Sequence, residues 1–142
     1  WKKYDAASLW KCPDTVRAKL SGATHVRMVL ASPAIFAGGW KPSWLDDAMT
    51  GEAPDTNVKL KLVGFTIQRW KAISGWSLAP PRGPKAVRRM VPAGGVYFFK
   101  VVAGDPSTLA DRWLQSVCDT DEDRRDGFGL ACWGTWKPKE NF

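Results

Sequence analysis

The sequence predicts an α+β fold in which an antiparallel sheet is covered on one face by helices. Three strand-like segments, at residues 25–32, 59–70 and 95–104, are separated by long loops, and one clear helical pattern lies at residues 107–117. The 142 residues are enough for one domain with its own core. The hydrophobic fraction of 44% and the charged fraction of 25% are typical of a globular protein.

The N-terminal part of the sequence predicts a helical segment followed by the first strand. Residues 6–20 carry apolar side chains at loosely helical spacing, interrupted by Pro13, so we expect one or two short helices ending at Gly22. Residues 25–32 alternate as a strand does and place three apolar side chains on one face, those of Val26, Met28 and Leu30.

Long loops surround the second predicted strand. Residues 33–45 are punctuated by Pro and Gly and carry large aromatic side chains, and residues 46–57 are polar, so both are expected to be loops. The alternation in residues 59–70 predicts a strand with a possible bulge at Gly64. One face of this strand would carry Leu60, Leu62 and Thr66, and the other Lys59, Lys61, Val63, Phe65 and Ile67. The Pro- and Gly-rich residues 79–95 are expected to be loop or extended chain.

The next segments predict one strand, one helix and a charged loop. Residues 95–104 are rich in β-branched and aromatic side chains, which favours a buried strand. Asp105 or Ser107 would cap a helix over residues 107–117, whose apolar side chains recur at helical spacing. Residues 119–126 are expected to be a solvated, charged loop.

Charge and cysteine content limit the classes of partner and compartment. A net charge of +7 and a pI near 9.5 fit a polyanionic partner, most often nucleic acid or an anionic membrane, and they fit simple solubility equally well. No apolar run approaches the ~20 residues of a membrane span. Of the polyanionic partners we expect nucleic acid and no membrane. The three cysteines and single histidine exclude a zinc module and favour a reduced, cytoplasmic protein, and we expect no metal or other cofactor.

Candidate catalytic groups are few. His25 is the only histidine, and as a general base it could serve metal-independent RNA cleavage. An exposed or capping histidine is the more common case, and no nucleophile motif appears. The acidic run at residues 119–126 fails the EF-hand pattern, since Arg124 occupies the position of the required glycine and Leu130 that of the final glutamate.

A basic loop at residues 82–89 is the first candidate for RNA binding. It contains no acidic residue, and its prolines restrict the backbone, so that its cations would lose little entropy on binding phosphates; they are Arg82, Lys85, Arg88 and Arg89. Just upstream, Arg69 and Lys71 add charge, and Trp70 and Trp76 offer faces on which a base could stack. We favour RNA or another single-stranded nucleic acid over a merely solvated loop.

The second candidate is the glycine-rich segment RRDGFGLACWGTW, in which residues 128–136 form the closing strand or loop. Its spacing is neither that of a P-loop nor that of a Rossmann turn. Four residues match the RNA-recognition-motif octamer, namely Gly127, Phe128, Gly129 and Trp133, whereas Asp126 and Leu130 depart from it. Bare backbone beside Arg125 and aromatic side chains would let a phosphate or base approach main-chain N–H groups. A tight turn leading into a core strand is the alternative.

Several stretches together resemble the C-terminal part of the third Cmr subunit, a RAMP-superfamily protein of type III-B CRISPR effector complexes. They are SPAIFAGGW (32–40), ISGWSLA (73–79), GPKAVRRMVPAGGVYFF (83–99) and DRRDGFGLACWGTW (123–136). The resemblance implies a ferredoxin-like, RRM-related fold with a C-terminal glycine-rich loop, which maps to Gly127, Gly129 and Gly134. It also implies a domain at residues 24–142, preceded by a helical or linker segment at residues 1–23, and a missing N-terminal RAMP domain.

The function implied by the resemblance is non-catalytic. Such subunits bind the 5′ tag of the guide RNA, contact the large cyclase-polymerase subunit among other Cmr subunits, and act in antiviral defence. The residues expected to contact RNA combine the basic loop with the glycine-rich segment: Arg82, Lys85, Arg88, Arg89, Arg125, Gly127, Phe128, Gly129 and Gly134.

Two alternatives remain open. One is a metal-independent endoribonuclease that processes guide RNA, which would need His25 in a cleft with a basic or tyrosine partner, Tyr4 or Tyr97. The other is a protein-interaction module without RNA contact, in which loop tryptophans such as Trp40, Trp44, Trp70 and Trp76 anchor interfaces. The salt dependence of RNA affinity separates this second case from the leading one.

Overall fold

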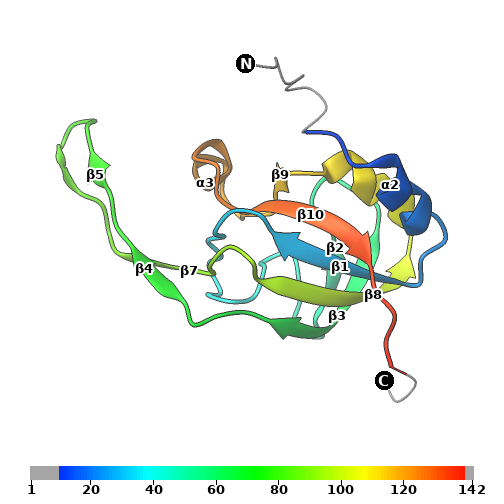
Figure 1. Cartoon of the computed structure of the whole chain (residues 1–142). Coiled ribbons are helices and arrows are strands. Elements are labelled where there is room, and N and C mark those ends of the chain that lie inside the picture. The colour runs from blue at the N-terminus through cyan, green and yellow to red at the C-terminus, as the bar shows by residue number, and fades with distance from the viewer. Residues whose placement is uncertain (1–9, 140–142) are drawn as a thin grey trace.

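The computed structural model describes residues 10–139, which form a curled antiparallel sheet with a few helices around it (Figure 1). The sheet has six strands in the order β2-β3-β8-β1-β10-β9. Their bounds are Thr50–Glu52 (β2), Lys59–Thr66 (β3), Val96–Ala103 (β8), His25–Leu30 (β1), Leu130–Thr135 (β10) and Gln115–Ser116 (β9). The α+β class is confirmed, and the four longest strands occupy the segments in which the sequence predicts strands.

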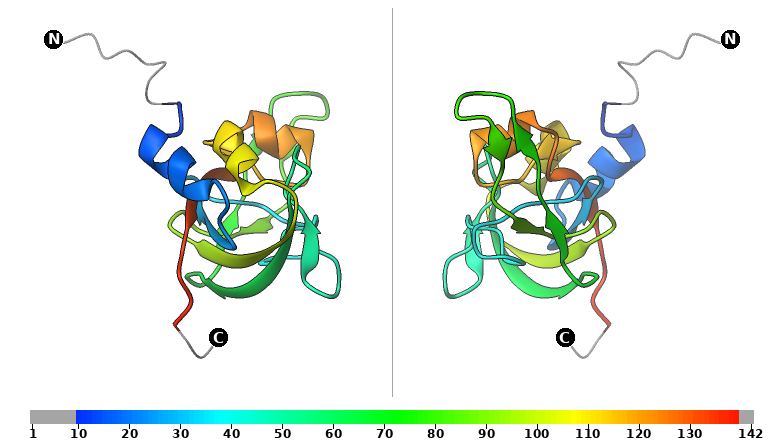
Figure 2. Two further views of the ribbon diagram at one scale, coloured as in Figure 1. Left: turned by 90° about the vertical axis from the view of Figure 1, so that its right-hand side faces the viewer. Right: turned by 90° about the vertical axis from the view of Figure 1, so that its left-hand side faces the viewer.

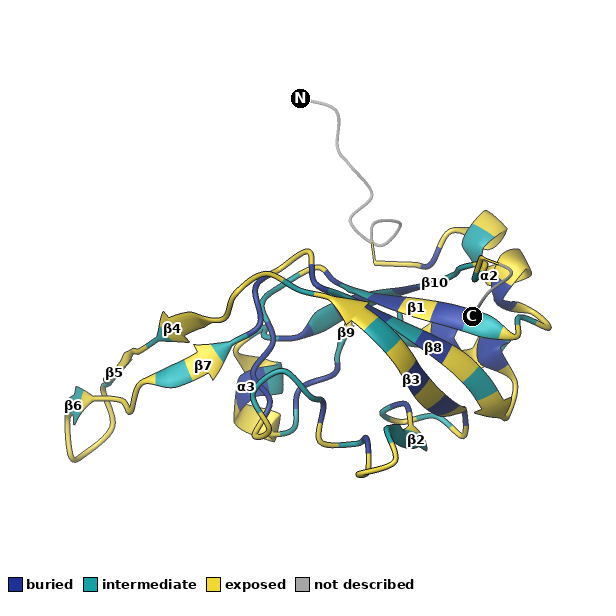
Figure 3. Ribbon diagram, turned by 90° about the horizontal axis from the view of Figure 1, so that it is seen from below, coloured by how far each residue is buried: buried dark blue, intermediate teal, exposed yellow. Residues whose placement is uncertain are grey.

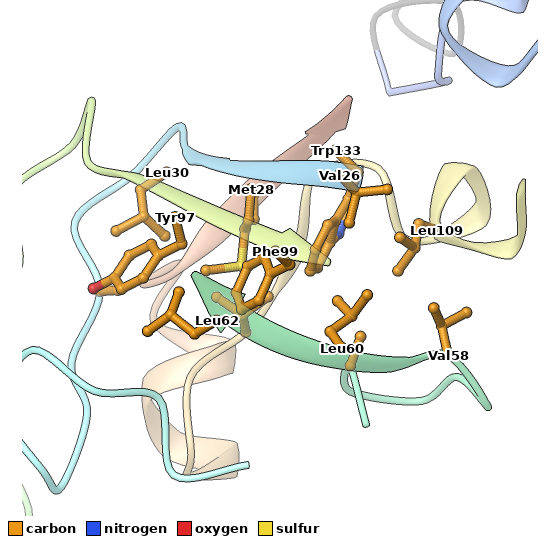
Figure 4. Packing of buried hydrophobic residues seen from close by; sticks show 14 of the residues in the cluster. Val26, Met28, Leu30, Val58, Leu60, Leu62, Tyr97, Phe99, Leu109 and Trp133 are labelled. Carbon is orange, nitrogen blue, oxygen red and sulfur yellow. The ribbon is translucent and has the colours of Figure 1, made fainter. Parts of the chain in front are cut away.

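Alternating side chains on these strands build the core on one face of the sheet. Val26, Met28 and Leu30 of β1 are all buried, as expected from the alternation, and the neighbouring strands add their own buried positions. Figure 4 shows these side chains meeting inside the curl of the sheet, between β1 and β8 on one side and β3 on the other, with the large rings of Tyr97, Phe99 and Trp133 among them. The opposite face, which we call the outer face, is left to polar and half-buried side chains.

A bulge in β3 changes the face on which one predicted side chain lies. Leu62 is opposite Phe99 on β8, whereas Gly64 is opposite Phe98, so Val63 is the additional residue. Phe65 is consequently opposite Tyr97 and on the same face as that core residue. Strict alternation would have placed it on the outer face, which carries the lysines. The expected bulge is therefore confirmed, and the expected face of Phe65 is wrong.

The helix predicted at residues 107–117 is wrong in its length and type. The structure has a 3₁₀ helix, η1 (Pro106–Arg112), in which the Asp105 side chain accepts a hydrogen bond from the backbone N–H of Ser107, as a cap does. The chain then leaves the helix at Leu114, where φ is +55°. The N–H groups of Leu114 and Val117 donate to carbonyls of β10 and the turn before it, at 2.8 and 2.9 Å. Pairing with β10 thus replaces the last helical turn.

The charged loop predicted at residues 119–126 is also wrong, because it contains a short helix, α3 (Asp121–Arg125). The Thr120 hydroxyl accepts a hydrogen bond from the Asp123 N–H at the start of the helix. Acidic residues fill its first turn and arginines its last, which is the charge order that the helix dipole favours.

The inner face of the sheet is covered by loop as well as by helix. The loop at residues 33–49 buries Ala34, Phe36 and Leu45 against it, and the Tyr97 hydroxyl donates to the Trp40 carbonyl at 2.6 Å. The helix predicted near the N-terminus is confirmed as α2 (Asp14–Leu20), which buries Leu20 and packs beside η1 (Figure 2). Residues 1–9, with Tyr4 and the start of the expected helical segment, lie outside the described residues.

An extended β-structure projects from the body between β3 and β8, and we call residues 68–90 the arm (Figure 1). It consists of two short antiparallel pairs, β4 (Lys71–Ile73) with β7 (Arg88–Met90), and β5 (Trp76–Ser77) with β6 (Gly83–Pro84). Figure 3 shows that most of the arm is exposed. None of the described helices has the length and apolar character needed to cross a bilayer.

Candidate nucleic-acid interface

The positive charge of the chain is concentrated in one continuous segment. Residues 56–104 contain nine Lys and Arg residues and no acidic residue. This segment is β3, the arm and β8 in sequence. Its formal charge of +9 exceeds the +7 of the whole chain, so the remaining residues are slightly acidic in sum.

The outer face of the sheet is the first part of the molecule on which these cations lie together. Lys61 of β3 is directly opposite Lys100 of β8, which is in turn opposite His25 of β1. In the next row Arg27 lies opposite Phe98 and Gly134. The four longest strands carry no acidic residue, and none of their exposed cations, Arg27, Lys59, Lys61 and Lys100, forms an ion pair within residues 10–139.

This face combines its charge with aromatic rings. Phe98 is half-buried among the cations, and Trp136 packs edge-on against both Phe98 and His25, at centroid distances of 5.1 and 5.4 Å. The Trp136 indole N–H donates to the Phe99 carbonyl at 3.2 Å, which fixes the ring at the end of β10. A backbone phosphate and an unstacked base would both find a partner on such a surface.

The arm carries the second group of cations, and two of the four predicted there are unpaired within the described residues. Arg82 and Arg89 are exposed and form no ion pair in residues 10–139. The Arg89 guanidinium lies over the Trp70 ring, 4.6 Å from its centroid. Arg69 and Lys71, close by in sequence, are also exposed.

Lys85 and Arg88, by contrast, bind the acidic helix α3. The Lys85 ammonium donates to Glu122 at 2.9 Å, and Arg88 Nη1 donates to Asp123 Oδ1 at 2.6 Å. Asp123 is only 2% exposed and receives a further hydrogen bond from the Thr120 hydroxyl at 2.8 Å. The acidic run that the sequence analysis assigned to solvent therefore neutralises half of the predicted RNA-binding loop.

The Lys85–Glu122 hydrogen bond also changes how both groups titrate. It raises the pKa of Lys85 and lowers the pKa of Glu122, because in each case the bond favours the charged form. Both side chains remain ionised over a wide range around neutral pH as a result. RNA contact by Lys85 or Arg88 stays a prediction, and it would have to compete with these carboxylates.

The glycine-rich segment makes a tight connection between α3 and β10. Gly127 and Gly129 both have positive φ, +83° and +72°, which favours glycine. A Cβ on Gly129 would lie 2.5 Å from the Cys118 sulfur, so that position has no space for a side chain. Gly134, however, lies within β10, which separates it from the turn and corrects its assignment to one glycine-rich loop.

The main-chain N–H groups of this segment already have partners. Those of Gly127, Phe128 and Gly129 donate to the carbonyls of Arg124, Asp123 and Pro33, at 3.2, 3.0 and 2.7 Å. The Leu130 N–H donates to the Ser32 hydroxyl at 2.9 Å. A phosphate would have to displace these bonds, so the geometry favours the tight-turn interpretation, and RNA contact at this turn stays a prediction.

The remaining predicted residues divide between these places. Phe128 packs against the core and lines a small hollow of about 190 Å³ together with Lys85 and Arg88, so the structure brings these three predicted residues together. Arg125 is exposed on α3 and donates to the Asp121 carbonyl. Gly134 lies below Arg27 on the outer face, where a Cβ would contact the Arg27 side chain at 3.6 Å.

The catalytic constellation considered for His25 forms only in part. Tyr97 lies in the core, its burial raises its pKa well above the ordinary value, and it is on the face opposite to His25. Lys100 is the cationic neighbour that the structure does supply. His25 Nδ1 is 3.0 Å from the Thr24 hydroxyl. Within residues 10–139 no group of His, Cys, Asp and Glu side chains could hold a metal ion.

The outer face is a candidate site that was not predicted from the sequence, although the sequence contains a signal for it. Arg27, Lys59, Lys61 and Lys100 occupy the polar positions of three alternating strands, and no acidic residue occurs in any of the four longest ones. The strand order then places β1, β3 and β8 side by side. Only that order, which alternation does not reveal, turns four scattered cations into one surface.

Comparison with known proteins assigns the chain to a family. No curated protein sequence matches the chain. A family model described as CRISPR-associated protein (Cas_Cmr3) matches residues 2–136, which is nearly the whole sequence. The resemblance found in four separate stretches is thereby confirmed, and the chain belongs to the family of third Cmr subunits, components of type III-B CRISPR complexes.

Proposed function

We propose that this chain is a non-catalytic, guide-RNA-binding subunit of the Cmr complex, with its main RNA contacts on the outer face of the sheet and on the arm. The 5′ tag region of the guide is the RNA that membership of this family suggests. Free cysteines throughout residues 10–139 fit a complex that acts in the cytoplasm.

One observation supports the proposal most strongly, the acid-free segment at residues 56–104. Ordinary surface charge intersperses both signs, because that suffices for solubility. Here seven of the nine cations form no ion pair with any residue in 10–139, and they are spread over the outer face and the arm. An uncompensated surface of this kind fits a polyanion, and it favours RNA binding over simple solubility as the reason for the net charge.

The strand order supports an RRM-related fold. The four longest strands occur along the chain as β1, β3, β8 and β10, and in the sheet as β3-β8-β1-β10. This is the arrangement of a βαββαβ ferredoxin-like sheet, in which the first and third strands are central. The first crossover here is the loop at residues 31–58 with β2, where that fold has a helix. RNA-recognition motifs bind RNA on the exposed face of the same sheet.

Exposed apolar side chains of the arm support a contact with another subunit of the complex, for which we propose the large cyclase-polymerase subunit. Leu78 and Val87 are 78% and 70% exposed, and Trp76 is 63% exposed. Large apolar side chains exposed this far are more typical of an interface than of a free surface. Replacing Leu78 with Ser should weaken co-purification with that subunit, whereas RNA binding should be unchanged because no charge is altered.

The RNA assignment is tested by fluorescence anisotropy with a labelled tag RNA and a scrambled RNA of equal length, each at two salt concentrations. Affinity that favours the tag and falls steeply with salt would support the proposal. Absence of binding at low salt would contradict it and favour the protein-interaction module. The same samples test catalysis: cleavage that depends on His25, and is lost in His25→Ala, would show an endoribonuclease.

A further inference from the structure

We infer that a cleft at the base of the arm binds one unstacked nucleobase of a single-stranded RNA. This inference rests on the proposed RNA-binding function, and it adds a base-binding site that is separate from the outer face. The cleft has a volume of about 400 Å³, within the range of small-molecule sites. It lies where β3 ends and the arm begins, and residues from both of these segments line it, as do residues of the loop at 38–40.

Three aromatic rings form the walls of the cleft. Trp40 and Phe65 stack on each other with centroids 4.5 Å apart and planes inclined by 25°, and Trp70 lines the cleft from the arm. Phe65 and Trp70 are 46% and 47% exposed, so their rings are accessible from solvent. Such rings are the surfaces on which RNA-binding proteins stack bases that have left the helical stack.

The β3 bulge is what places Phe65 in this cleft. Without the additional residue Val63, alternation would direct Phe65 to the outer face beside Lys61. With it, Phe65 pairs with Tyr97 and stacks on Trp40. Bulges frequently redirect side chains beside functional sites, so this one accounts for an exposed ring that the core does not require.

The polar residues of the cleft fit a nucleotide better than they fit an apolar side chain of another protein. Arg69 and Arg89 line it, and no acidic residue does. The Arg89 guanidinium lies over the Trp70 ring, so it can reach a phosphate beside a base bound in the cleft. Gln68 supplies both a donor and an acceptor, which is what the edge of a base requires.

The test is an abasic scan of a fluorescein-labelled single-stranded tag RNA, in which one nucleotide at a time lacks its base. Affinities are measured with the full 142-residue chain and with its Trp70→Ala variant. For the wild type, one position should bind about 5- to 100-fold more weakly when abasic. That position should lose this sensitivity in Trp70→Ala and recover part of it in Trp70→Phe.

Trp10→Ala is the matched control, because it removes a similarly exposed tryptophan beside α2 and should leave the scan unchanged. If RNA binds and the scan is flat, or Trp70→Ala shows the same sensitive position, the inference is overturned while the proposed function stands. A flat scan would indicate that a side chain of another subunit, and not a base, occupies the cleft. If the wild type binds no RNA, both the inference and the proposed function fail.

Discussion

At the scale of single residues, the arginines of the basic loop have different roles although they look equivalent in the sequence. Arg88 binds a carboxylate that is almost completely buried, whereas Arg82 is exposed and has no ion-pair partner in residues 10–139. A buried carboxylate that loses its cation keeps the cost of desolvation without the compensating charge. We therefore assign Arg88 to stability and Arg82 to the surface available for RNA.

Arg88→Ala is expected to lower the free energy of unfolding by about 2 kcal/mol, because Asp123 would be left with the Thr120 hydroxyl and no cation. Urea denaturation measures this change. Arg82→Ala, the matched control in the same loop, should change it by less than about 0.5 kcal/mol. Equal effects of the two substitutions would show that the Arg88–Asp123 ion pair does not stabilise the fold.

The two turn glycines give a second prediction at this scale. Gly127→Ala meets only the cost of a left-handed conformation, about 1–2 kcal/mol, since no atom lies within 4 Å of the added Cβ. Gly129→Ala adds to that a clash with the Cys118 sulfur and should lower the melting temperature considerably more. If the turn instead bound phosphate and were otherwise free, the two variants would show similar stability and similar losses of RNA affinity.

At the scale of elements, the arm is attached to the body through α3. Lys85 and Arg88 lie on the arm, and Glu122 and Asp123 lie on the helix. The arm has little other support, since its pairs β4–β7 and β5–β6 form two-stranded sheets separate from the main one. Its orientation therefore depends on charge as well as on packing.

This attachment predicts a pH dependence. The pKa of Glu122 is lower in the folded protein than its ordinary value near 4.5, so its contribution is complete above that value and is lost as the pH falls through the folded pKa. Wild type should be more stable than Glu122→Gln at pH 7, and the difference should vanish in acid. Glu52→Gln, at an exposed glutamate without an ion pair in residues 10–139, is the matched control and should change the free energy of unfolding at pH 7 by less than about 0.5 kcal/mol in urea denaturation.

The strands could be predicted from the sequence, whereas the start and end of the helices between them could not. Val26, Met28 and Leu30 alternate because each strand has one buried face, and that period is visible locally. The apolar residues 109–117 also fit a helix, yet the positive φ at Leu114 and the pairing with β10 depend on a strand that follows later in the chain. Helix α3 could have been recognised, since Thr120 and Asp123 stand at the spacing of a capping box.

The candidate site, too, could be predicted from the sequence only in part. The basic loop was visible as a run of arginines, but the carboxylates that bind half of it come from a segment more than 30 residues away. The outer face could not be predicted because its cations are far apart in the sequence. They come from three strands and become neighbours only through the order of those strands in the sheet. Family membership was carried by long, unusual strings and needed no geometry.

At the scale of the whole molecule, a large share of the positive charge lies in a segment without any negative charge. The acid-free segment at residues 56–104 forms one continuous part of the structure, and the acidic residues lie before and after it in sequence. Such separation opposes compactness through repulsion between like charges, most directly between Lys61 and Lys100, which are opposite each other on adjacent strands. A polyanion bound across the outer face would remove that cost.

The most direct test of this account is the RNA affinity of a Lys61→Glu, Lys100→Glu double variant, compared with Lys19→Glu on the exposed surface of α2. We predict that the double variant binds tag RNA at least tenfold more weakly at low salt, with a shallower salt dependence, since it loses two phosphate contacts. Lys19→Glu should bind as the wild type does. Equal affinities of all three proteins, with the fold intact by circular dichroism, would contradict the assignment of RNA binding to the outer face.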